Sequence, residues 1–120
     1  MDFIETEANR LLEIFTTTSF LDCHPLTREF LEIPARTGIY GLRLLDQEIL
    51  YIGKSSEMRK RFRGGHKSLG WAFIDRLNPD NVRIVAVRLG YQAWIQSLEI
   101  EARMIQIVRP RHNSRIRQLE

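Results

Sequence analysis

The stretch that decides the fold covers residues 38–53 and reads GIYGLRLLDQEILYIG. It begins with Gly-Ile-Tyr and ends with the reversed triplet Tyr-Ile-Gly, and both halves are rich in β-branched and aromatic residues. Two such runs on either side of a short polar pair, here Asp46-Gln47, predict a β-hairpin.

The predicted pairing of this hairpin brings the tyrosines of the two triplets together. A two-residue or four-residue loop centred on Asp46-Gln47 places Leu42 opposite Tyr51 and Tyr40 opposite Gly53. Residues that face each other across a hairpin share a side of the sheet, as do residues two apart in one strand. Tyr40 and Tyr51 are therefore expected on the same face, about 7–8 Å apart at the backbone. A three-residue loop would break this parity.

Hydrophobic spacing outside the hairpin predicts a mixed architecture. The expected elements are, in order, a helix over residues 2–15, a short helical turn within 20–36, the two hairpin strands, a basic helix within 56–63 capped by Ser55 or Ser56 and ended by Gly64-Gly65, a helix over 69–77, a strand over 82–89 and a helix over 92–108. They predict an α/β (α+β) fold with a three-stranded, mainly antiparallel sheet flanked by helices. In this interpretation residues 1–33 form an extra N-terminal helical extension and residues 34–120 the principal domain, within one compact unit.

Length and composition restrict the class of protein. A chain of 120 residues fits one domain, and no apolar run approaches the roughly 20 residues that span a membrane. The first ten residues are acidic, unlike a signal peptide, so an intracellular (cytoplasmic) protein is expected. The one cysteine, Cys23, has no second cysteine for an internal disulfide and is expected to be a small buried apolar residue.

The charge distribution is uneven and favours a polyanionic partner. Residues 1–35 carry two Arg against seven Asp or Glu, a net charge of −5, so the rest of the chain must carry +8 to give the total of +3. The positive charge gathers in residues 54–67 and 109–117. Such groups are often only solvated surface, but two of them on one small domain make a polyanion a reasonable partner. The acidic N-terminal region is a candidate surface for a homodimer or a partner protein.

One glutamate lies where the helix predicted over residues 92–108 should carry an apolar residue. On a helical wheel Glu101 falls in the middle of an apolar stripe whose other members are Trp94, Leu98, Ile105 and Val108. An unpaired buried carboxylate is costly, so Glu101 must be paired, protonated, bound to a cation or placed at the rim of a cleft. The plain structural alternatives are a salt bridge to a neighbouring Arg and a helix rotated so that Glu101 reaches water.

These features, in this order, are typical of one family. A Gly-Ile-Tyr triplet, ten residues, a Tyr-Ile-Gly triplet, a basic helix and a glutamate-bearing helix that ends in PRHN resemble the GIY-YIG nuclease family, most closely the N-terminal nuclease domain of UvrC excision-repair proteins. The resemblance covers about residues 34–115. It implies a metal-dependent endonuclease that hydrolyses phosphodiester bonds in DNA.

The resemblance assigns candidate site residues position by position. They are the triplet tyrosines Tyr40 and Tyr51, the lysine after the second triplet Lys54, the catalytic arginine Arg61, the metal-binding glutamate Glu101 and the terminal asparagine Asn113. Many members carry His or Tyr four residues after the arginine, where this chain has Gly65. His66, one residue later, either reaches the same space or is there by coincidence. Asn113 is expected to brace the active-site end of the chain.

The resemblance also implies roles. Glu101 would hold one Mg²⁺ or Mn²⁺ ion, Arg61 would clamp the phosphate with its planar fork, and a tyrosine, preferably Tyr40, would act as general base. Tyr51 would then orient water or phosphate. A free phenol is a poor base at neutral pH, so the positive charges of Lys54 and Arg61 are expected nearby.

Two functions compete at this point. One is an active DNA endonuclease, and the other is a DNA-binding module that keeps the fold but has lost useful activity, which the glycine at position 65 makes conceivable. In both, surface cations would contact phosphates without sequence preference. The candidates are Arg59, Lys60, Arg63, Lys67, Arg109 and Arg111.

Overall fold

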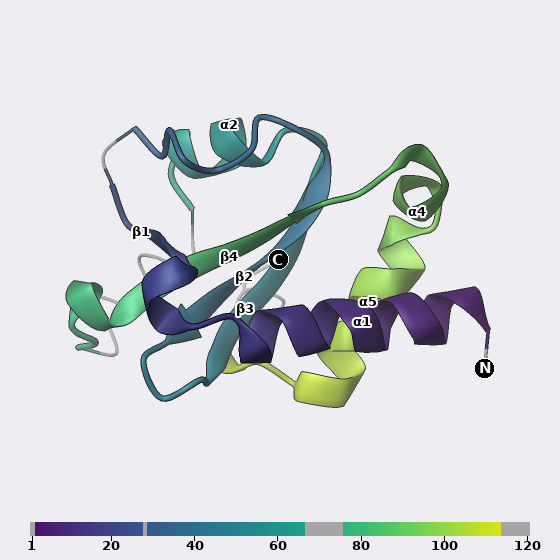
Figure 1. The fold of residues 1–120 in the computed structure, drawn as a ribbon, viewed down its shortest axis with the longest axis horizontal. Helices are drawn as coiled ribbons and strands as arrows, with labels where there is room; N and C mark the ends of the chain where they lie inside the picture. The colour runs from purple at the N-terminus through teal and green to yellow at the C-terminus, as the bar shows by residue number, and fades with distance from the viewer. Residues whose placement is uncertain (1, 28, 67–75, 114–120) are drawn as a thin grey trace.

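The computed structural model describes residues 2–27, 29–66 and 76–113 (Figure 1). Its elements are α1 (Phe3–Thr17), the 3₁₀ turn η1 (Phe20–Asp22), β1 (His24–Pro25), β2 (Gly38–Leu44), β3 (Ile49–Ser55), α2 (Met58–Arg63), the 3₁₀ turn η2 (Pro79–Asn81), β4 (Val82–Arg88), α4 (Tyr91–Ile95) and α5 (Ser97–Val108). The helix predicted over 69–77 falls largely on residues 67–75, which lie outside the described residues, as does Lys67. Among the described helices, none is both long enough and apolar enough to cross a membrane.

One antiparallel sheet organises the fold, with its four strands in the order β1-β4-β2-β3. The three long strands are the predicted ones, and the predicted α+β class is confirmed. The two-residue strand β1, which pairs with β4, is an addition that the sequence does not predict. β4 pairs along the whole of β2, from Gly38 opposite Arg88 to Leu44 opposite Val82. β3 is therefore an edge strand, next to the strand that carries the first triplet.

The hairpin loop differs from the prediction. It has three residues rather than two or four, because the Leu44 amide donates to the Glu48 carbonyl over 2.8 Å. Gln47 ends the loop in the left-handed conformation, with φ of 77°. Gly and Asn are the usual residues in that conformation, so the sequence carries no strong signal for this loop. Alone, a loop of this length would place the two triplet tyrosines on opposite faces.

A β-bulge cancels the effect of the loop. β3 carries one extra residue, Leu50, at the point where its register with β2 shifts. Beyond the bulge the register is the predicted one, with Tyr40 opposite Gly53. Tyr40 and Tyr51 therefore share a face of the sheet, as predicted, and both belong to the same apolar cluster.

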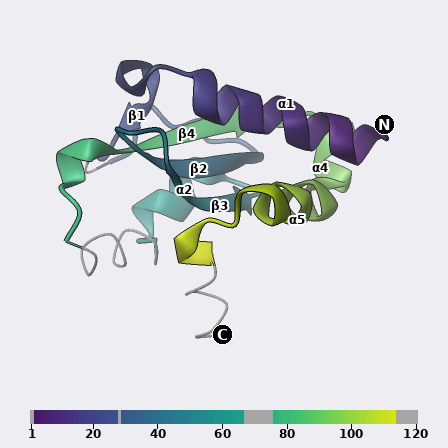
Figure 2. The same ribbon diagram turned by 90° about the horizontal axis from the view of Figure 1, so that it is seen from below.

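The two faces of the sheet carry separate cores. α1 and α5 lie side by side under one face (Figure 2), where they pack against apolar side chains of β2, β3 and β4. α2 and the segment before β2 cover the other face. There Met58 and Phe62 are buried against Tyr40, Leu42 and Ile84. We call these the α5 face and the α2 face.

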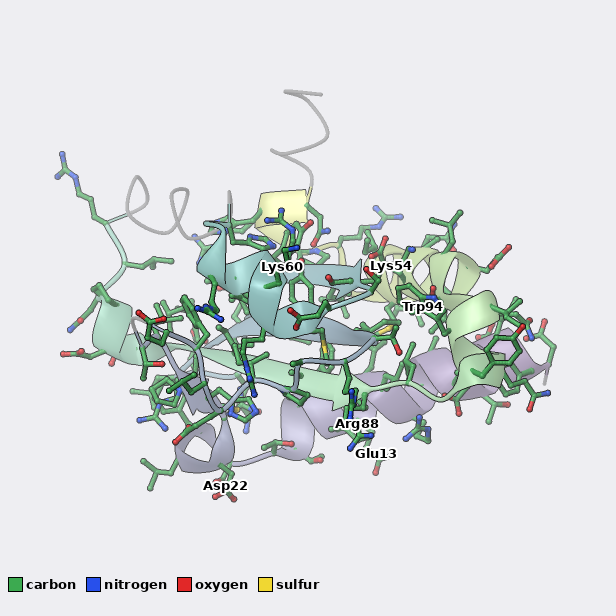
Figure 3. All side chains as sticks on the ribbon, turned by 90° about the horizontal axis from the view of Figure 1, so that it is seen from above. Glu13, Asp22, Lys54, Lys60, Arg88 and Trp94 are labelled. Carbon is green, nitrogen blue, oxygen red and sulfur yellow. The ribbon has the colours of Figure 1, made fainter. Side chains whose placement is uncertain are left out.

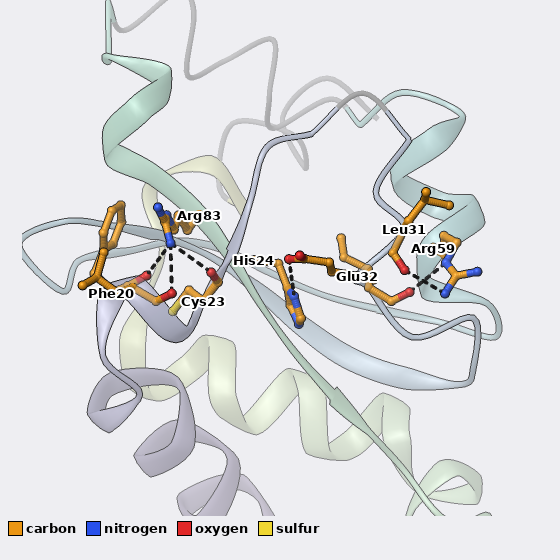
Figure 4. A network of polar contacts seen from close by, with 9 residues as sticks. Phe20, Cys23, His24, Leu31, Glu32, Arg59 and Arg83 are labelled. Carbon is orange, nitrogen blue, oxygen red and sulfur yellow. Dashed lines mark hydrogen bonds and ion pairs between the residues drawn. The ribbon is translucent and has the colours of Figure 1, made fainter.

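Two arginines attach the N-terminal segment to the sheet. Arg43, buried on β2, donates to the carbonyls of Phe15 (2.9 Å) and Thr18 at the end of α1, where a helix leaves carbonyls without partners. Arg83 donates to the carbonyls of Phe20, Leu21 and Cys23 (Figure 4). The apolar side of α1 is buried in the core of the α5 face, and Cys23 is buried as predicted. A homodimer or partner protein on this helix stays a prediction.

The long helix predicted over residues 92–108 is two helices. The backbone leaves helical geometry at Gln96 (φ −103°, ψ 15°), between α4 and α5. Within α5 the buried residues are Ser97, Ile100 and Met104. Leu98 is 62% exposed, and Glu101 lies half-buried at the flank of the buried face. The prediction of Glu101 in the middle of an apolar stripe is wrong, because the break gives α4 and α5 different buried faces.

The cap of α2 also differs from the prediction. Glu57, rather than Ser55 or Ser56, is the N-cap, and its carboxylate accepts from the Lys60 amide at 3.2 Å. The Ser55 hydroxyl instead accepts from the Glu57 amide at 3.1 Å. A carboxylate is favourable at this end of a helix because the first turn leaves amides without backbone partners.

Candidate active site

Tyr40 and His66 form a hydrogen-bonded pair on the α2 face. The Tyr40 hydroxyl lies 2.8 Å from His66 Nε2, and both side chains are buried. Tyr40 belongs to the central strand β2, whereas His66 follows the end of α2. A phenol and an imidazole at this distance can pass a proton between them, because each can donate or accept.

Two further rings fix the orientation of this pair. Phe62 of α2 meets Tyr40 edge-on with ring centroids 4.7 Å apart, and it stacks on His66 at 5.2 Å. Tyr51, half-buried on β3, lies 6.2 Å from Tyr40 and 4.7 Å from His66 between ring centroids. Such edge-to-face and offset contacts are favourable geometries for aromatic rings. We call Tyr40, Tyr51, Phe62 and His66 the aromatic cluster.

The glycine of the second triplet leaves room for the tyrosine of the first. A Cβ atom at Gly53 would lie 2.5 Å from Tyr40 Oη and 2.8 Å from Tyr51 Cε1, which is closer than such atoms pack. Tyr40 is the cross-strand partner of Gly53, so its phenol lies across the glycine backbone. The glycine of the second triplet is therefore a packing requirement of the aromatic cluster.

A glycine turn brings His66 to Tyr40. Gly65 has φ of 88°, a conformation that glycine adopts without a steric penalty. The position where many family members carry His or Tyr is thus used here for the turn, and the next side chain, His66, reaches the Tyr40 hydroxyl.

The buried setting keeps both groups of the pair neutral near pH 7. Burial raises the pKa of the Tyr40 phenol, the neighbouring Tyr51 adds to the rise, and the Arg61 guanidinium opposes it. Burial also lowers the pKa of His66 to about 3, and the electrostatic effects of Arg61 and His112 act in the same direction. A neutral imidazole therefore lies against a neutral phenol.

Arg61 and Glu101 both act electrostatically on Tyr40, from elements that cover opposite faces of the sheet. Arg61, half-exposed on α2, donates to the Gly65 carbonyl at 3.1 Å, and its charge acts on both Tyr40 and His66. Glu101, half-buried on α5, acts on Tyr40 in the opposite sense and helps to raise the pKa of its phenol. The Tyr40 hydroxyl is thus under the influence of one cation and one carboxylate.

Glu101 is the carboxylate that the resemblance assigns to a metal ion, and metal binding by it stays a prediction. Within residues 2–27, 29–66 and 76–113, no group of three or more His, Cys, Asp or Glu side chains is placed to bind one. Mg²⁺ is usually held by one or two carboxylates, with waters and substrate phosphates in the remaining positions. One half-buried carboxylate that influences the Tyr40 hydroxyl fits such an ion, because it supplies the hard oxygen ligand.

Asn113 pairs with the edge of β3. Its Oδ1 accepts from the Ile52 amide (2.9 Å) and its Nδ2 donates to the Ile52 carbonyl (2.8 Å). The side-chain amide thus imitates the hydrogen bonding of a neighbouring strand. Because Ile52 lies between Tyr51 and Gly53, these two bonds hold the second triplet in place, which is the geometry that a bracing role requires.

Lys54 lies on the other side of β3 from the tyrosines. Alternation along the strand places it with Ile52 on the α5 face. Its Nζ lies 4.8 Å from the centroid of the Trp94 ring on α4, and Figure 3 shows the two side chains together. The site therefore surrounds the sheet edge, with the aromatic cluster and Arg61 on one side and Lys54 and α5 on the other.

Three of the predicted phosphate-contacting arginines have partners within the chain. Arg59 donates to the backbone carbonyls of Ile33 (2.9 Å) and Leu31 (3.0 Å) and so holds the segment before β2 (Figure 4). Arg63 and Arg111 form ion pairs, at 3.4 Å with Glu29 and at 2.9 Å with Glu48. Their charge is partly used by the fold.

Two other predicted cations face solvent. Lys60 is exposed on α2 (Figure 3), and Arg109 is exposed at the end of α5, with φ of 51°. Both side chains are exposed and could contact a polyanion. Nucleic-acid binding by any of these cations stays a prediction.

The structure adds two residues to the site that the sequence interpretation does not assign to it. Phe62 of α2 packs against both Tyr40 and His66. His112 is fully buried, and its charge acts on His66. The only sequence signal for His112 is its place beside Asn113 in the PRHN run.

Comparison with known proteins identifies the family of the chain. The GIY-YIG catalytic domain family matches residues 36–115. The chain is 27% identical over 106 residues, 83% of its length, to the UvrABC system protein C of Acaryochloris marina (strain MBIC 11017). It is 44% identical over 48 residues, 40% of its length, to the UvrABC system protein C of Synechococcus elongatus (strain ATCC 33912 / PCC 7942 / FACHB-805).

The matched part of the relatives is small. The aligned stretches make up 16% and 7% of those two proteins, so the chain spans less than a fifth of the curated relatives it matches. No solved structure gives a significant match. The family match, however, covers most of the chain and includes both triplets, Arg61 and Glu101. The chain belongs to the GIY-YIG catalytic domain family.

Proposed function

We propose that this chain is a metal-dependent endonuclease that hydrolyses phosphodiester bonds in DNA, with Tyr40 as the general base. The observation that carries the proposal is the 2.8 Å contact between the Tyr40 hydroxyl and His66 Nε2, under the charge of Arg61. The likeness to UvrABC system protein C makes DNA repair the setting that we propose.

Tyr40 and His66 together form a proton relay that can take a proton from the attacking water. The attacking water gives its proton to Tyr40 Oη while Tyr40 gives its own proton to His66 Nε2, so no free phenolate forms. This step requires the neutral tautomer of His66 that carries its proton on Nδ1, because Nε2 must be free to accept the proton from Tyr40. The hydroxide then attacks phosphorus, the bond from phosphorus to the leaving oxygen breaks, and the leaving oxygen takes up a proton from solvent.

Substrate binding favours this proton transfer. Burial and, to a lesser degree, the positive charge of Arg61 lower the pKa of His66, which makes the free imidazole a weak base. A phosphate bound to Arg61 cancels part of that charge, and the basicity of His66 rises accordingly. The imidazole is therefore a stronger proton acceptor when a phosphate is bound to Arg61 than in the free protein.

The remaining residues act on the phosphate. The guanidinium fork of Arg61 donates to two phosphate oxygens and stabilises the charge that grows in the transition state. Glu101 would hold Mg²⁺ or Mn²⁺, which when bound stabilises that charge and the leaving oxygen. Tyr51, half-exposed beside His66, orients water or phosphate, and Lys54 adds positive charge from the other side of β3.

Plasmid nicking tests the proposal. Wild type is expected to nick supercoiled DNA with Mg²⁺. Glu101→Gln is expected to bind the same DNA but to nick it more slowly, by a factor of about 100 or more. Glu99→Gln, exposed on the same helix, is the matched control and should keep the wild-type rate. If wild type and Glu101→Gln both bind DNA and neither cuts it with Mg²⁺ or Mn²⁺, the chain is a binding module and the nuclease proposal is wrong.

A further inference from the structure

Lys54 is held by an aromatic ring. Its Nζ lies 4.8 Å from the centroid of the Trp94 indole, which is the geometry of a cation–π interaction, and tryptophan is the strongest partner for one. Both side chains are half-buried, where β3 passes α4 (Figure 3). Among the described carboxylates, none forms an ion pair with Lys54.

The fold fixes the two residues from separate elements. Lys54 belongs to β3 and pairs with Ile39 of β2, so its backbone is set by the sheet. Trp94 packs against the core of the α5 face. Because the helix breaks at Gln96, Trp94 leaves the stripe of α5 and lies against the lysine at the sheet edge instead.

A ring and a carboxylate hold a lysine with different consequences. A carboxylate neutralises the ammonium, whereas the indole attracts it through its quadrupole and leaves the charge uncompensated. A free lysine side chain also loses much rotamer freedom when a phosphate fixes it. A lysine that is already held by a ring loses less, so it is better prepared to bind an anion.

We propose that Trp94 is a positioning residue that holds the Lys54 ammonium at the edge of β3, ready for the negative charge of the scissile phosphate. The inference rests on the proposed nuclease function, in which Lys54 supplies positive charge to the site. Trp94 acts only through Lys54 in this arrangement. Its effect on cleavage must therefore disappear when the charge of Lys54 is removed.

Substitutions at Trp94 measure the effect. Trp94→Leu keeps an apolar side chain without a π face, and it is expected to lower kcat for plasmid nicking by roughly 5–10-fold with little change in KM. Trp94→Phe keeps a weaker π face and is expected to recover most of the loss. Tyr91→Leu, an aromatic substitution at an 82% exposed position of the same helix, is the matched control and should keep the wild-type rate.

A double-mutant cycle separates positioning from packing. Trp94→Leu is expected to have no further effect on cleavage in a Lys54→Met background, because the group it positions is then gone. The same fold-loss in both backgrounds would overturn the proposal and leave Trp94 as a packing residue. If Trp94→Leu does not fold, the cycle is run with Trp94→Phe, whose smaller loss must vanish in the same way.

A spectroscopic readout does not depend on cleavage. The ring current of Trp94 is expected to move the ε-methylene proton signals of Lys54 upfield in NMR, and Trp94→Leu should abolish this shift. If wild type cuts DNA but the Lys54 signals show no upfield shift, the positioning role is wrong and the nuclease function is unaffected. The same conclusion follows if the effects of the Trp94 and Lys54 substitutions on cleavage are additive. A wild type that does not cut overturns the proposed function, and with it any catalytic role of Trp94.

Discussion

The two faces of the sheet bury polar groups in different ways. On the α5 face, the buried guanidinium of Arg43 is bonded to backbone carbonyls at the end of α1. On the α2 face, the buried hydroxyl of Tyr40 is bonded to another titratable side chain, His66, and both are under the charge of Arg61. The first arrangement attaches a helix to the sheet. In the second, a proton can pass between Tyr40 and His66. Titratable groups that perturb one another mark a candidate site better than burial alone.

Replacing one arginine on each face is expected to give the largest difference in cleavage rate between the two faces. Arg61→Leu removes the proposed phosphate clamp and is expected to lower the rate of plasmid nicking by about 10²–10³-fold. Arg103→Leu on the α5 face removes an ion pair with Glu5 at 2.9 Å, and nicking is expected to stay at the wild-type rate. Rates are measured with Mg²⁺ on supercoiled plasmid. Equal losses in the two variants would show that the faces do not differ in this way.

Truncation of Asn113 tests how the edge of the site is held. Asn113→Ala leaves the amide and the carbonyl of Ile52 without their partners, at a cost of about 1–3 kcal/mol for each group. Urea unfolding measures the loss. Asn78→Ala, which removes an exposed cap on the Asp80 amide, should cost less. A larger loss at Asn78 would contradict the bracing of β3 by Asn113.

Two glycine substitutions test the packing role of Gly53 in the second triplet, with Gly64 as the control. Gly53→Ala forces a Cβ to within 2.5 Å of Tyr40 Oη, so it is expected to destabilise the fold by about 1–3 kcal/mol and to displace the phenol. Gly64→Ala meets its nearest neighbour at 3.4 Å in an αR backbone and should change stability by no more than about 0.5 kcal/mol. Thermal unfolding and nicking are measured for both. A neutral Gly53→Ala would mean that Tyr40 does not lie across this glycine.

The burial of His66 makes stability depend on pH. Its pKa of about 3 in the folded chain lies below its ordinary value of 6.5, so between these values the unfolded chain binds the extra proton. Stability is therefore complete above about pH 6.5 and falls as the pH drops toward 3, by at most about 1.4 kcal/mol per pH unit. His66→Gln is expected to reduce this slope between pH 6.5 and 5 in urea unfolding. An unchanged slope would mean that His66 titrates normally in the folded state.

The hairpin was predictable in outline because its strands are rich in β-branched and aromatic residues and its register follows from residue parity. The loop was not predictable, because Gln47 has no composition signal for a left-handed residue. The bulge at Leu50 was not predictable either, because Ile49 and Leu50 are both apolar and both buried, one on each face of the sheet. The predicted tyrosine placement is correct only because these two deviations cancel.

The candidate site was predictable where it lies within single elements and motifs. The order of the triplets, the basic helix and the glutamate was enough to select Tyr40, Arg61 and Glu101. The helical wheel failed for Glu101, because the break at Gln96 carries no Gly or Pro signal. The contact of His66 with Tyr40 depends on the turn at Gly65, and it appears only when the chain is folded.

The most direct test of the proposed centre is the cleavage rate of Tyr40→Phe, measured with Mg²⁺ on supercoiled plasmid beside its DNA affinity. This substitution keeps the ring and its contacts with Phe62 and removes the hydroxyl that faces His66. If Tyr40 is the base, nicking falls by about 10²–10⁴-fold while DNA binding and folding stay close to wild type. A Tyr40→Phe variant that nicks at the wild-type rate would show that the Tyr40–His66 pair is not the catalytic centre.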